Sequence, residues 1–222
     1  MGRGLFITGT DTDVGKTYVT ALLVKTLRSA GYDVGYYKAA ISGARTVEES
    51  DAGFVNRFAQ IREPEDMLLS YLYQNAVSPH LAARIEGNPV EKDVIMSAWE
   101  RVTAAYPYVT MEGSGGIMCP IRHDEKAVYY LEDIIRWLRL PVLVIADAGL
   151  GTINRVVTTC EYIRYRNISV KGIILNHWKG GVMEEDNVEM IEEIIGMKVL
   201  ARVKKGDTAL DIDPETIISL YE

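Results

Sequence analysis

The chain has 222 residues, which fits one domain or at most two small ones and is ample for a buried core. Hydrophobic residues make up 48% and charged residues 25%, the composition of an ordinary soluble globular protein. The formal charge of −7 argues against a general nucleic-acid binder, which usually carries a basic face. An anionic ligand would therefore have to be bound by local groups.

Neither targeting nor metal-binding signals are visible in the sequence. Cys119 and Cys160 lack the spacing of metal ligands, and no apolar segment is long enough to span a bilayer. No segment combines the charged start and apolar core of a signal peptide. We therefore expect a soluble cytoplasmic protein with neither nucleic acid nor membrane as a partner.

Strand and helix patterns alternate along the chain, which predicts an α/β fold with a mostly parallel sheet and helices on both faces. We treat residues 1–222 as one domain. Strands are expected at 5–7, 33–37, 108–111, 142–146, 170–175 and 198–200. Helices are expected from about 19, at 51–60, from 78, at 90–106, 131–139, 153–163 and 183–195, and at the C-terminus.

The segment between the first strand and the first helix, Gly9-Thr10-Asp11-Thr12-Asp13-Val14-Gly15-Lys16-Thr17, predicts a phosphate-binding loop. Unpaired N–H groups and the helix dipole favour an anion there, Lys16 adds positive charge, and the Thr17 hydroxyl suits Mg²⁺. The strict pattern would place the first glycine at Thr10, so Gly9 makes the loop a variant. The alternative is a chance Gly-Lys-Thr at an ordinary helix start, which the flanking strand and helix disfavour.

Polar or glycine-bearing segments also follow other expected strands, at residues 38–43, 112–116, 147–154 and 176. Open α/β sheets bind ligands at the carboxyl ends of their strands, so these segments indicate one shared site. Glu112, directly after a strand, would be either an Mg²⁺ ligand or an exposed loop glutamate. Asp51 would be either a helix N-cap or a metal or nucleotide ligand. Lys38 would be either a solvated lysine or a group that holds an anionic substrate during phosphoryl transfer.

Other apparent motifs do not hold. Gly113-Ser114-Gly115 lacks the first glycine of a nucleophile elbow, and Asn154 replaces the third glycine of a dinucleotide fingerprint. The three histidines show no metal-ligand spacing and suit local hydrogen bonding better. Phosphoryl transfer is therefore the leading interpretation.

Six segments occur in the order and spacing of the dethiobiotin synthetase family, which the chain resembles from its start to about Asn176. They are residues 9–17, 35–38 with 42–43, 78–80, 112–116, 150–154 and 176. The variant loop is itself a feature of that family. The resemblance implies a P-loop NTPase-type fold and an ATP-dependent ring closure in biotin synthesis. CO₂ would form a carbamate on one amine of 7,8-diaminononanoate, the carbamate would attack the γ-phosphate, and the second amine would displace phosphate.

The resemblance also implies residue roles. The ATP contacts would be Asp13, Val14, Gly15, Lys16, Thr17, Tyr18, Asp51, Glu112, Gly113, Ser114, Gly115 and, reading the adenine, Asn176. Thr17, Asp51 and Glu112 would surround Mg²⁺. Lys16 and Lys38 would be catalytic, with Lys38 facing the carbamate and the γ-phosphate. The substrate would lie near Thr12, Lys38 and Ser42, and the partner subunit would hold its carboxylate with Gly151, Thr152 and Asn154. A homodimer with active sites at its interface is implied.

Three departures from the family pattern bear on these roles. Ala39 stands where a proline is usual, Arg155 replaces a common histidine, and residues 202–206 lack the usual proline-bearing segment beside the base. Base selectivity is therefore open. One alternative function is another ATPase with a variant loop, although a partitioning ATPase would carry a lysine between positions 10 and 14. The other is a non-catalytic nucleotide-binding regulator, which would not account for Lys38, Ser42 and residues 151–154 together.

Overall fold

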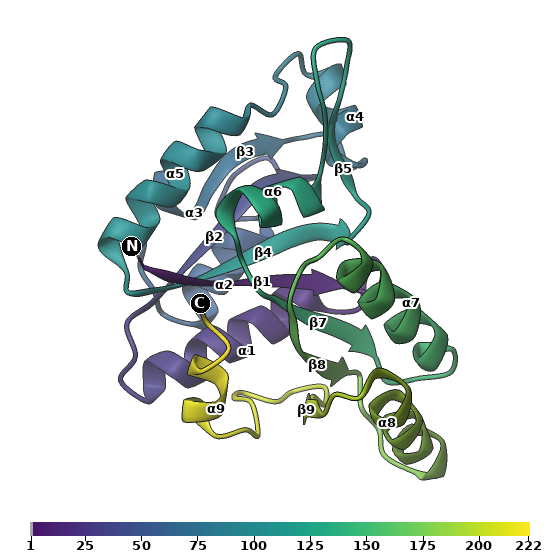
Figure 1. The fold of residues 1–222 in the computed structure, drawn as a ribbon. Helices are drawn as coiled ribbons and strands as arrows, with labels where there is room; N and C mark the ends of the chain where they lie inside the picture. The colour runs from purple at the N-terminus through teal and green to yellow at the C-terminus, as the bar shows by residue number, and fades with distance from the viewer. Residues whose placement is uncertain (1) are drawn as a thin grey trace.

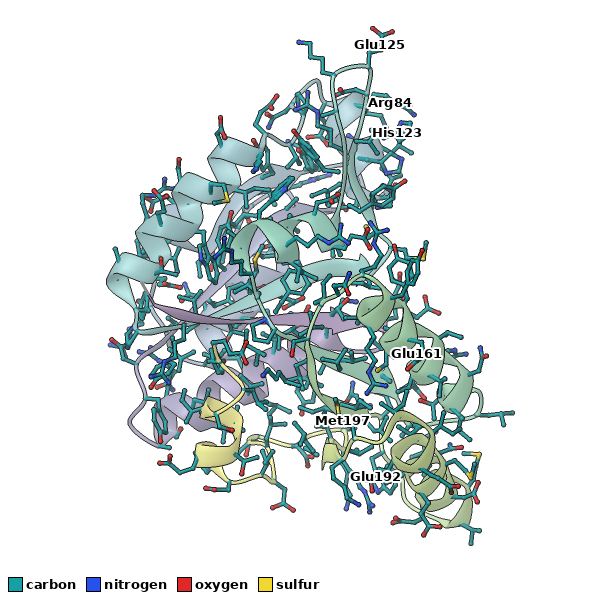
Figure 2. All side chains as sticks on the ribbon, in the orientation of Figure 1. Arg84, His123, Glu125, Glu161, Glu192 and Met197 are labelled. Atoms are coloured by element: carbon teal, nitrogen blue, oxygen red, sulfur yellow. The ribbon has the colours of Figure 1, made fainter. Side chains whose placement is uncertain are left out.

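A computed structural model describes residues 2–222 and contains a seven-stranded, fully parallel sheet with the order β3-β2-β4-β1-β7-β8-β9 (Figure 1). The strands of this sheet are β1 (Arg3–Gly9), β2 (Val34–Ser42), β3 (Leu69–Tyr73), β4 (Tyr108–Gly116), β7 (Val142–Asp147), β8 (Val170–Asn176) and β9 (Val199–Arg202). A separate antiparallel hairpin is formed by β5 (Pro120–His123) and β6 (Val128–Tyr130). It projects from the body of the molecule with Glu125 at its tip (Figure 2).

Helices cover both faces of the sheet, as the alternating pattern predicted. They are α1 (Lys16–Ser29), α2 (Asp51–Phe58), α3 (Glu65–Leu68), α4 (Pro79–Ile85), α5 (Lys92–Ala105), α6 (Leu131–Leu138), α7 (Thr152–Tyr165), α8 (Val182–Ile195) and α9 (Pro214–Ile218). Side chains of α1, α2 and α9 pack in one core, and those of α4 to α8 pack in the other. Within residues 2–222, none of the helices is both long and apolar enough to cross a membrane.

The two cores follow from the alternation of side chains along buried strands. In β7, Val142 and Val144 belong to one core while Leu143 and Ile145 belong to the other, and all four are fully buried. Successive side chains of a strand point to opposite faces, so a continuous aliphatic segment is required where helices cover both faces. The expectation of a buried central strand at 142–146 is confirmed.

Two predicted strand ends were wrong, and both errors concern the site. The strand expected to end at Lys38 continues to Ser42, because β3, which the sequence analysis did not identify, pairs with it from Lys38 onward. The strand expected to end before Glu112 continues to Gly116, so Glu112 lies within β4. The β5–β6 hairpin and α3 were also not predicted.

A buried carboxyl group lies beside β2. Glu63 is only 6% exposed, and its Oε2 accepts a long hydrogen bond of 3.4 Å from the backbone N–H of Tyr36. Its Oε1 has no hydrogen-bond partner in the part of the chain that the structure describes. Burial therefore raises the pKa of Glu63 to about 7.

We expect Glu63→Gln to stabilise the protein in a pH-dependent way. Below about pH 4.5 the carboxyl is neutral in both the folded and the unfolded chain, and its ionisation costs nothing. As pH rises to about 7, the unfolded chain ionises first, and the folded state loses up to about 3 kcal/mol of stability. Thermal unfolding should show a higher Tm for the variant at pH 8 and little gain at pH 4.5. The exposed control Glu65→Gln should show no such difference, and an equal effect at both pH values would contradict the assignment.

Candidate active site

The glycine-bearing loop connects the end of β1 to the start of α1, as predicted. Gly15 adopts a left-handed conformation with φ of 82°, and a Cβ there would lie 2.1 Å from the side-chain nitrogen of Asn176. A Cβ on Gly9 would lie 2.9 Å from the carbonyl oxygen of Asp11. Contacts this short exclude any side chain at either position. Glycine is therefore required at position 9 because the backbone of the loop comes close to it. This gives a physical reason for a first glycine one position earlier than the strict pattern places it.

The start of α1 presents groups suited to an anion. Within the described part of the chain, no side chain caps this end of the helix, and its first turn contains no acidic residue. The Lys16 side chain folds back over the loop, where its Nζ donates to the carbonyl of Asp11 at 3.2 Å. Burial lowers the pKa of Lys16, and the neighbouring charge of Lys38 lowers it further. Free N–H groups at a helix N-terminus and a nearby lysine can together bind a phosphate group.

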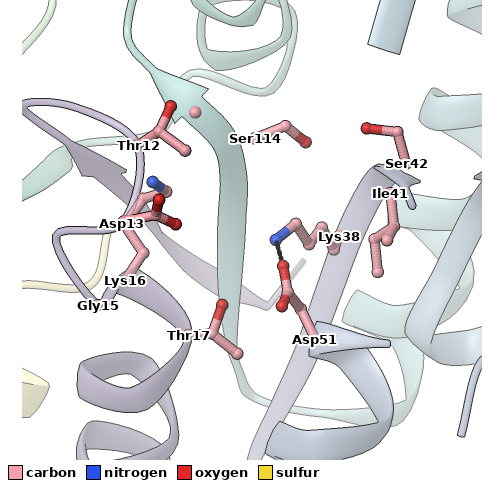
Figure 3. Close-up of a pocket in the computed structure, with 11 residues that line it drawn as sticks. Thr12, Asp13, Gly15, Lys16, Thr17, Lys38, Ile41, Ser42, Asp51 and Ser114 are labelled. Carbon is pink, nitrogen blue, oxygen red and sulfur yellow. Dashed lines mark hydrogen bonds and ion pairs between the residues drawn. The ribbon is translucent and has the colours of Figure 1, made fainter. Parts of the chain in front are cut away.

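Beside the loop, the Lys38 ammonium lies between two carboxylates, and Figure 3 shows its contact with that of Asp51. Its Nζ is 2.6 Å from Oδ2 of Asp51 and 2.7 Å from Oε1 of Glu112. The Thr17 hydroxyl donates to the same Oε1 at 2.8 Å. Burial alone would lower the pKa of Lys38, but the charges of Glu112 and Asp51 outweigh burial and raise it. Lys38 is therefore held in its charged form.

Burial decides the alternatives left open for Lys38 and Glu112, and the capping of α2 decides that for Asp51. Lys38 is 3% exposed and Glu112 is 1% exposed, so neither is a solvated surface residue. The N-cap of α2 is Ser50, whose hydroxyl oxygen accepts from the N–H of Gly53 at 3.4 Å. The N-cap interpretation of Asp51 was therefore wrong. Burial raises the pKa of the Asp51 carboxyl, but the charge and the hydrogen bond of Lys38 more than offset this and lower it.

Ten of the predicted residues line one open cavity of about 350 Å³ between the loop, β2 and β4 (Figure 3). Of the predicted residues, Thr12, Asp13, Gly15, Lys16, Thr17, Lys38, Ser42, Asp51, Ser114 and Gly115 line it. Ile41 also lines it and was not predicted. Ser114 is held in place because its hydroxyl donates to the carbonyl of Ala40 at 2.7 Å. The cavity thus combines two lysines with the start of a helix.

Other predicted residues lie behind or outside this cavity. Val14 is buried, and Gly113 packs against the Phe6 ring. The Tyr18 hydroxyl donates to the carbonyl of Asp207 at 2.5 Å, so its side chain points away from the loop. Asn176 is 2% exposed and its side-chain nitrogen donates to the carbonyl of Val14 at 2.9 Å, which places it against the loop on the β8 side.

The helix-start residues at 151–154 do not line the cavity of their own chain. Gly151 and Asn154 are exposed at the N-terminus of α7. Thr152 is fully buried, and its backbone N–H donates to the carbonyl of Gly149 at 3.2 Å. Its side chain is therefore unable to contact a ligand at this surface.

Thr17, Asp51 and Glu112 provide oxygen donors that suit Mg²⁺. Among the residues described, no group of three or more His, Cys, Asp or Glu side chains could hold a metal. A hydroxyl with two carboxylates is nevertheless a fitting set, because Mg²⁺ commonly uses one or two carboxylates and completes its coordination with phosphate oxygens and water. The Lys38 ammonium already bridges the two carboxylates, so this place favours positive charge. These residues could hold Mg²⁺ that arrives with a nucleotide.

Sequence reasoning missed Tyr36, although a signal for it was present. Its phenol hydroxyl donates to Oε2 of Glu112 at 3.1 Å, and its side chain is fully buried. Side chains two residues apart in a strand point to the same face, so Tyr36 lies on the face of Lys38. Recognising 34–42 as one strand would have placed the tyrosine next to the site.

A parallel sheet with a glycine loop between its central strand and a helix defines a P-loop nucleotide-binding protein. A family model described as an AAA domain matches residues 3–209. Among solved structures, a ParA family ATPase from Chlorobium tepidum has a TM-score of 0.58 and 14% identity, covering 99% of this chain and 90% of that one. The MinD cell division protein of Aquifex aeolicus has a TM-score of 0.56 and 13% identity, covering 92% of this chain and 82% of that one. These structures support the fold alone.

Closer relatives identify the family. The chain is 47% identical to the ATP-dependent dethiobiotin synthetase BioD of Brachyspira hyodysenteriae, over 100% of both chains. It is 41% identical to the protein of the same name from Clostridium kluyveri, over 98% of this chain and 92% of the relative. The chain belongs to the dethiobiotin synthetase family, and the resemblance inferred from its motifs is confirmed.

We expect Lys38→Met to lower the free energy of unfolding by about 3–5 kcal/mol, because it leaves the Glu112 carboxylate buried without its cation. Urea denaturation would measure the change. Lys38→Met combined with Glu112→Gln should recover part of the loss, since the uncompensated charge is then gone. Lys171→Met removes a partly exposed lysine that pairs with Glu222 and should cost less than about 1 kcal/mol. Equal costs for the two lysines would contradict the analysis.

Proposed function

We propose that the protein is an ATP-dependent synthase that forms dethiobiotin from 7,8-diaminononanoate and CO₂. The observation that carries this proposal is that Lys16 of the phosphate loop and Lys38 of β2 line one cavity. A carbamate and a triphosphate are both anions, and they react only if their mutual repulsion is offset. Full-length identity to relatives named for this activity supports the same conclusion.

In the proposed mechanism, the backbone N–H groups from Asp13 to Thr17 and the Lys16 ammonium bind the phosphates of ATP. Thr17, Asp51 and Glu112 would hold Mg²⁺, which offsets the charge of the β- and γ-phosphates when it is bound. Lys38 faces the carbamate and the γ-phosphate. Because both carboxylates beside it keep it charged, Lys38 can stabilise negative charge but is not suited to accept a proton.

The reaction then follows in two displacements. A carbamate oxygen attacks the γ-phosphorus and ADP leaves, giving a carbamic–phosphoric mixed anhydride. The second amine attacks the carbonyl carbon, phosphate leaves with the electron pair of the broken C–O bond, and the nitrogen loses a proton as the cyclic urea forms. A diamine that reacts as the free amine needs no strong general base. This fits a cavity that histidine and cysteine do not line.

We propose the remaining contacts from where the other residues lie around the cavity. Thr12 and Ser42 line it and would lie near the diamine, and Ser114 and Gly115 also line it. Tyr18 and Gly113 would contribute through the backbone, because their side-chain positions face elsewhere. Asn176 lies on the β8 side of the loop, away from Lys38, and would face the base of ATP.

We further propose that the enzyme is a homodimer. Gly151 and Asn154 are exposed at the start of α7, and the adjacent Leu150 is 84% exposed. Among residues 2–222, no side chain caps the N-terminus of α7, and its first turn has no acidic residue; such an end can bind a carboxylate. These groups lie outside the cavity of their own chain, so they would hold the substrate carboxylate of the partner's site. Thr152 would act only by shaping this turn.

We expect ADP formation only when the diamine and bicarbonate are both supplied, with one dethiobiotin for each ATP. Coupled ADP measurement and chromatographic detection of dethiobiotin would test this. Lys16→Ala should abolish turnover, because the outer phosphates lose their main cation. Hydrolysis of ATP that does not depend on the diamine and yields no cyclic urea would favour another ATPase, and nucleotide binding without turnover would favour a regulator.

Asn154→Ala should mainly raise the KM for the diamine, with a smaller effect on the KM for ATP. The matched control is Thr158→Ala, one turn further along α7, where the hydroxyl bonds only to its own helix backbone. Steady-state kinetics would separate the two substrates. An unchanged diamine KM in Asn154→Ala would remove the support for the interface carboxylate site.

A further inference from the structure

The two oxygens of Glu112 have different neighbours. Oε1 accepts hydrogen bonds from the Thr17 hydroxyl at 2.8 Å and from the Lys38 ammonium at 2.7 Å. Oε2 accepts one from the Tyr36 hydroxyl at 3.1 Å. The Glu112 side chain is completely buried, so bulk water does not replace any of these partners. These contacts fix the orientation of the carboxylate, with Oε1 toward Thr17 and Lys38 and Oε2 toward Tyr36.

Tyr36 reaches Glu112 because of the register of the sheet. In the pairing of β2 with β4, Lys38 lies opposite Glu112 and Tyr36 lies opposite Thr110. The tyrosine therefore approaches from further back along β2, away from the phosphate loop at the strand ends. Its side chain is fully buried in the core that also contains α1. Packing of the ring fixes the position of its hydroxyl.

We propose that Tyr36 is a positioning residue for the metal–nucleotide site, because its hydroxyl fixes the Glu112 carboxylate with Oε1 facing Thr17 and the loop. The proposal rests on the function proposed above, in which Glu112 is an Mg²⁺ ligand. The terminal torsion of a glutamate is broad and roughly two-fold, so packing alone orients its oxygens weakly. Loss of a hydrogen-bond partner behind a metal-ligating carboxylate typically costs about 10–100-fold in metal affinity.

The chain offers a matched control in the next residue. Tyr37 is also fully buried on β2, but it points to the opposite core, and its hydroxyl lies 2.6 Å from the hydroxyl of Ser70. Replacing either tyrosine by phenylalanine removes one hydrogen bond between side chains, buried at Tyr36 and partly buried at Tyr37. Only the change at Tyr36 also releases an oxygen of Glu112. The pair therefore separates a role in the metal site from a general loss of stability.

The test measures Mn²⁺ binding to the full chain in the presence of saturating ADP, with electron paramagnetic resonance as the readout. Tyr36→Phe should raise the Kd for Mn²⁺ at least about tenfold. The Kd of this variant for ADP, measured in EDTA, should stay within about twofold of the value for the unchanged protein, since the loop itself is intact. Tyr37→Phe should leave both constants within about twofold, although both variants lose thermal stability.

A second measurement tests whether Tyr36 acts through Glu112. In a Glu112→Gln background, Tyr36→Phe should cause almost no additional loss of Mn²⁺ affinity, because the group that it positions is already altered. The proposal is overturned if Tyr36→Phe binds Mn²⁺ like the unchanged protein, if Tyr37→Phe weakens binding equally, or if the two changes at Tyr36 and Glu112 are additive. Failure of the unchanged protein to bind Mn²⁺ would overturn the metal site and this proposal together. Dethiobiotin formation by the unchanged protein tests the proposed function separately.

Discussion

The Lys38 ammonium is shared between half-exposed Asp51 and buried Glu112, and this contact joins three segments that are far apart in the chain. Lys38 comes from the middle of β2, Asp51 from the first turn of α2, and Glu112 from the middle of β4. Lys38 and Glu112 are buried, so removing either charge would leave the other poorly compensated away from water, whereas Asp51 is half exposed. The contact therefore fixes the relative positions of these segments before any ligand binds.

The same contact sets the charge of the cavity. Lys16 and Lys38 offset Asp51 and Glu112, so this cluster of four groups carries little net charge, in a chain whose overall charge is −7. Attraction for a polyanion must then come from the N–H groups at the start of α1 and from a cation that binds with it. Under the proposed function, arrival of that cation beside the carboxylates would free the ammonium of Lys38 to interact with the two anionic reactants.

The topology of the sheet places the cluster where a ligand can reach it. Strand β1 lies between β4 and β7, and the chain turns to one side for β2 and β4 and to the other for β7 and β8. Ligands of open α/β sheets bind at such a switch point, at the carboxyl ends of the strands. Lys38 lies on the β2 side of the loop, Lys16 belongs to the loop and the start of α1, and Asn176 lies on the β8 side. A nucleotide lying across the loop would then have its phosphates and its base on opposite sides of β1.

Much of this arrangement could be predicted from the sequence, because it depends on local patterns. The loop between the first strand and α1, the aliphatic strand at 142–146 and the polar residues at strand ends are all encoded in short segments. The parts that were missed depend on pairing between distant segments. Continuation of β2 to Ser42 requires β3, and the position of Glu112 inside β4 requires its pairing with β2. Burial of Thr152 and the contact of Tyr36 with Glu112 likewise arise only from tertiary packing.

Under the proposed function, a carbamate oxygen is transferred to the γ-phosphorus of ATP in the cavity between Lys16 and Lys38. The most direct measurement is the fate of oxygen from C¹⁸O₂, added to the enzyme with ATP and the diamine in ordinary water and sampled before the label exchanges. Phosphorus NMR of the released phosphate should show one ¹⁸O in each labelled molecule, with the second ¹⁸O retained in the urea carbonyl. Unlabelled phosphate formed alongside dethiobiotin would contradict the account.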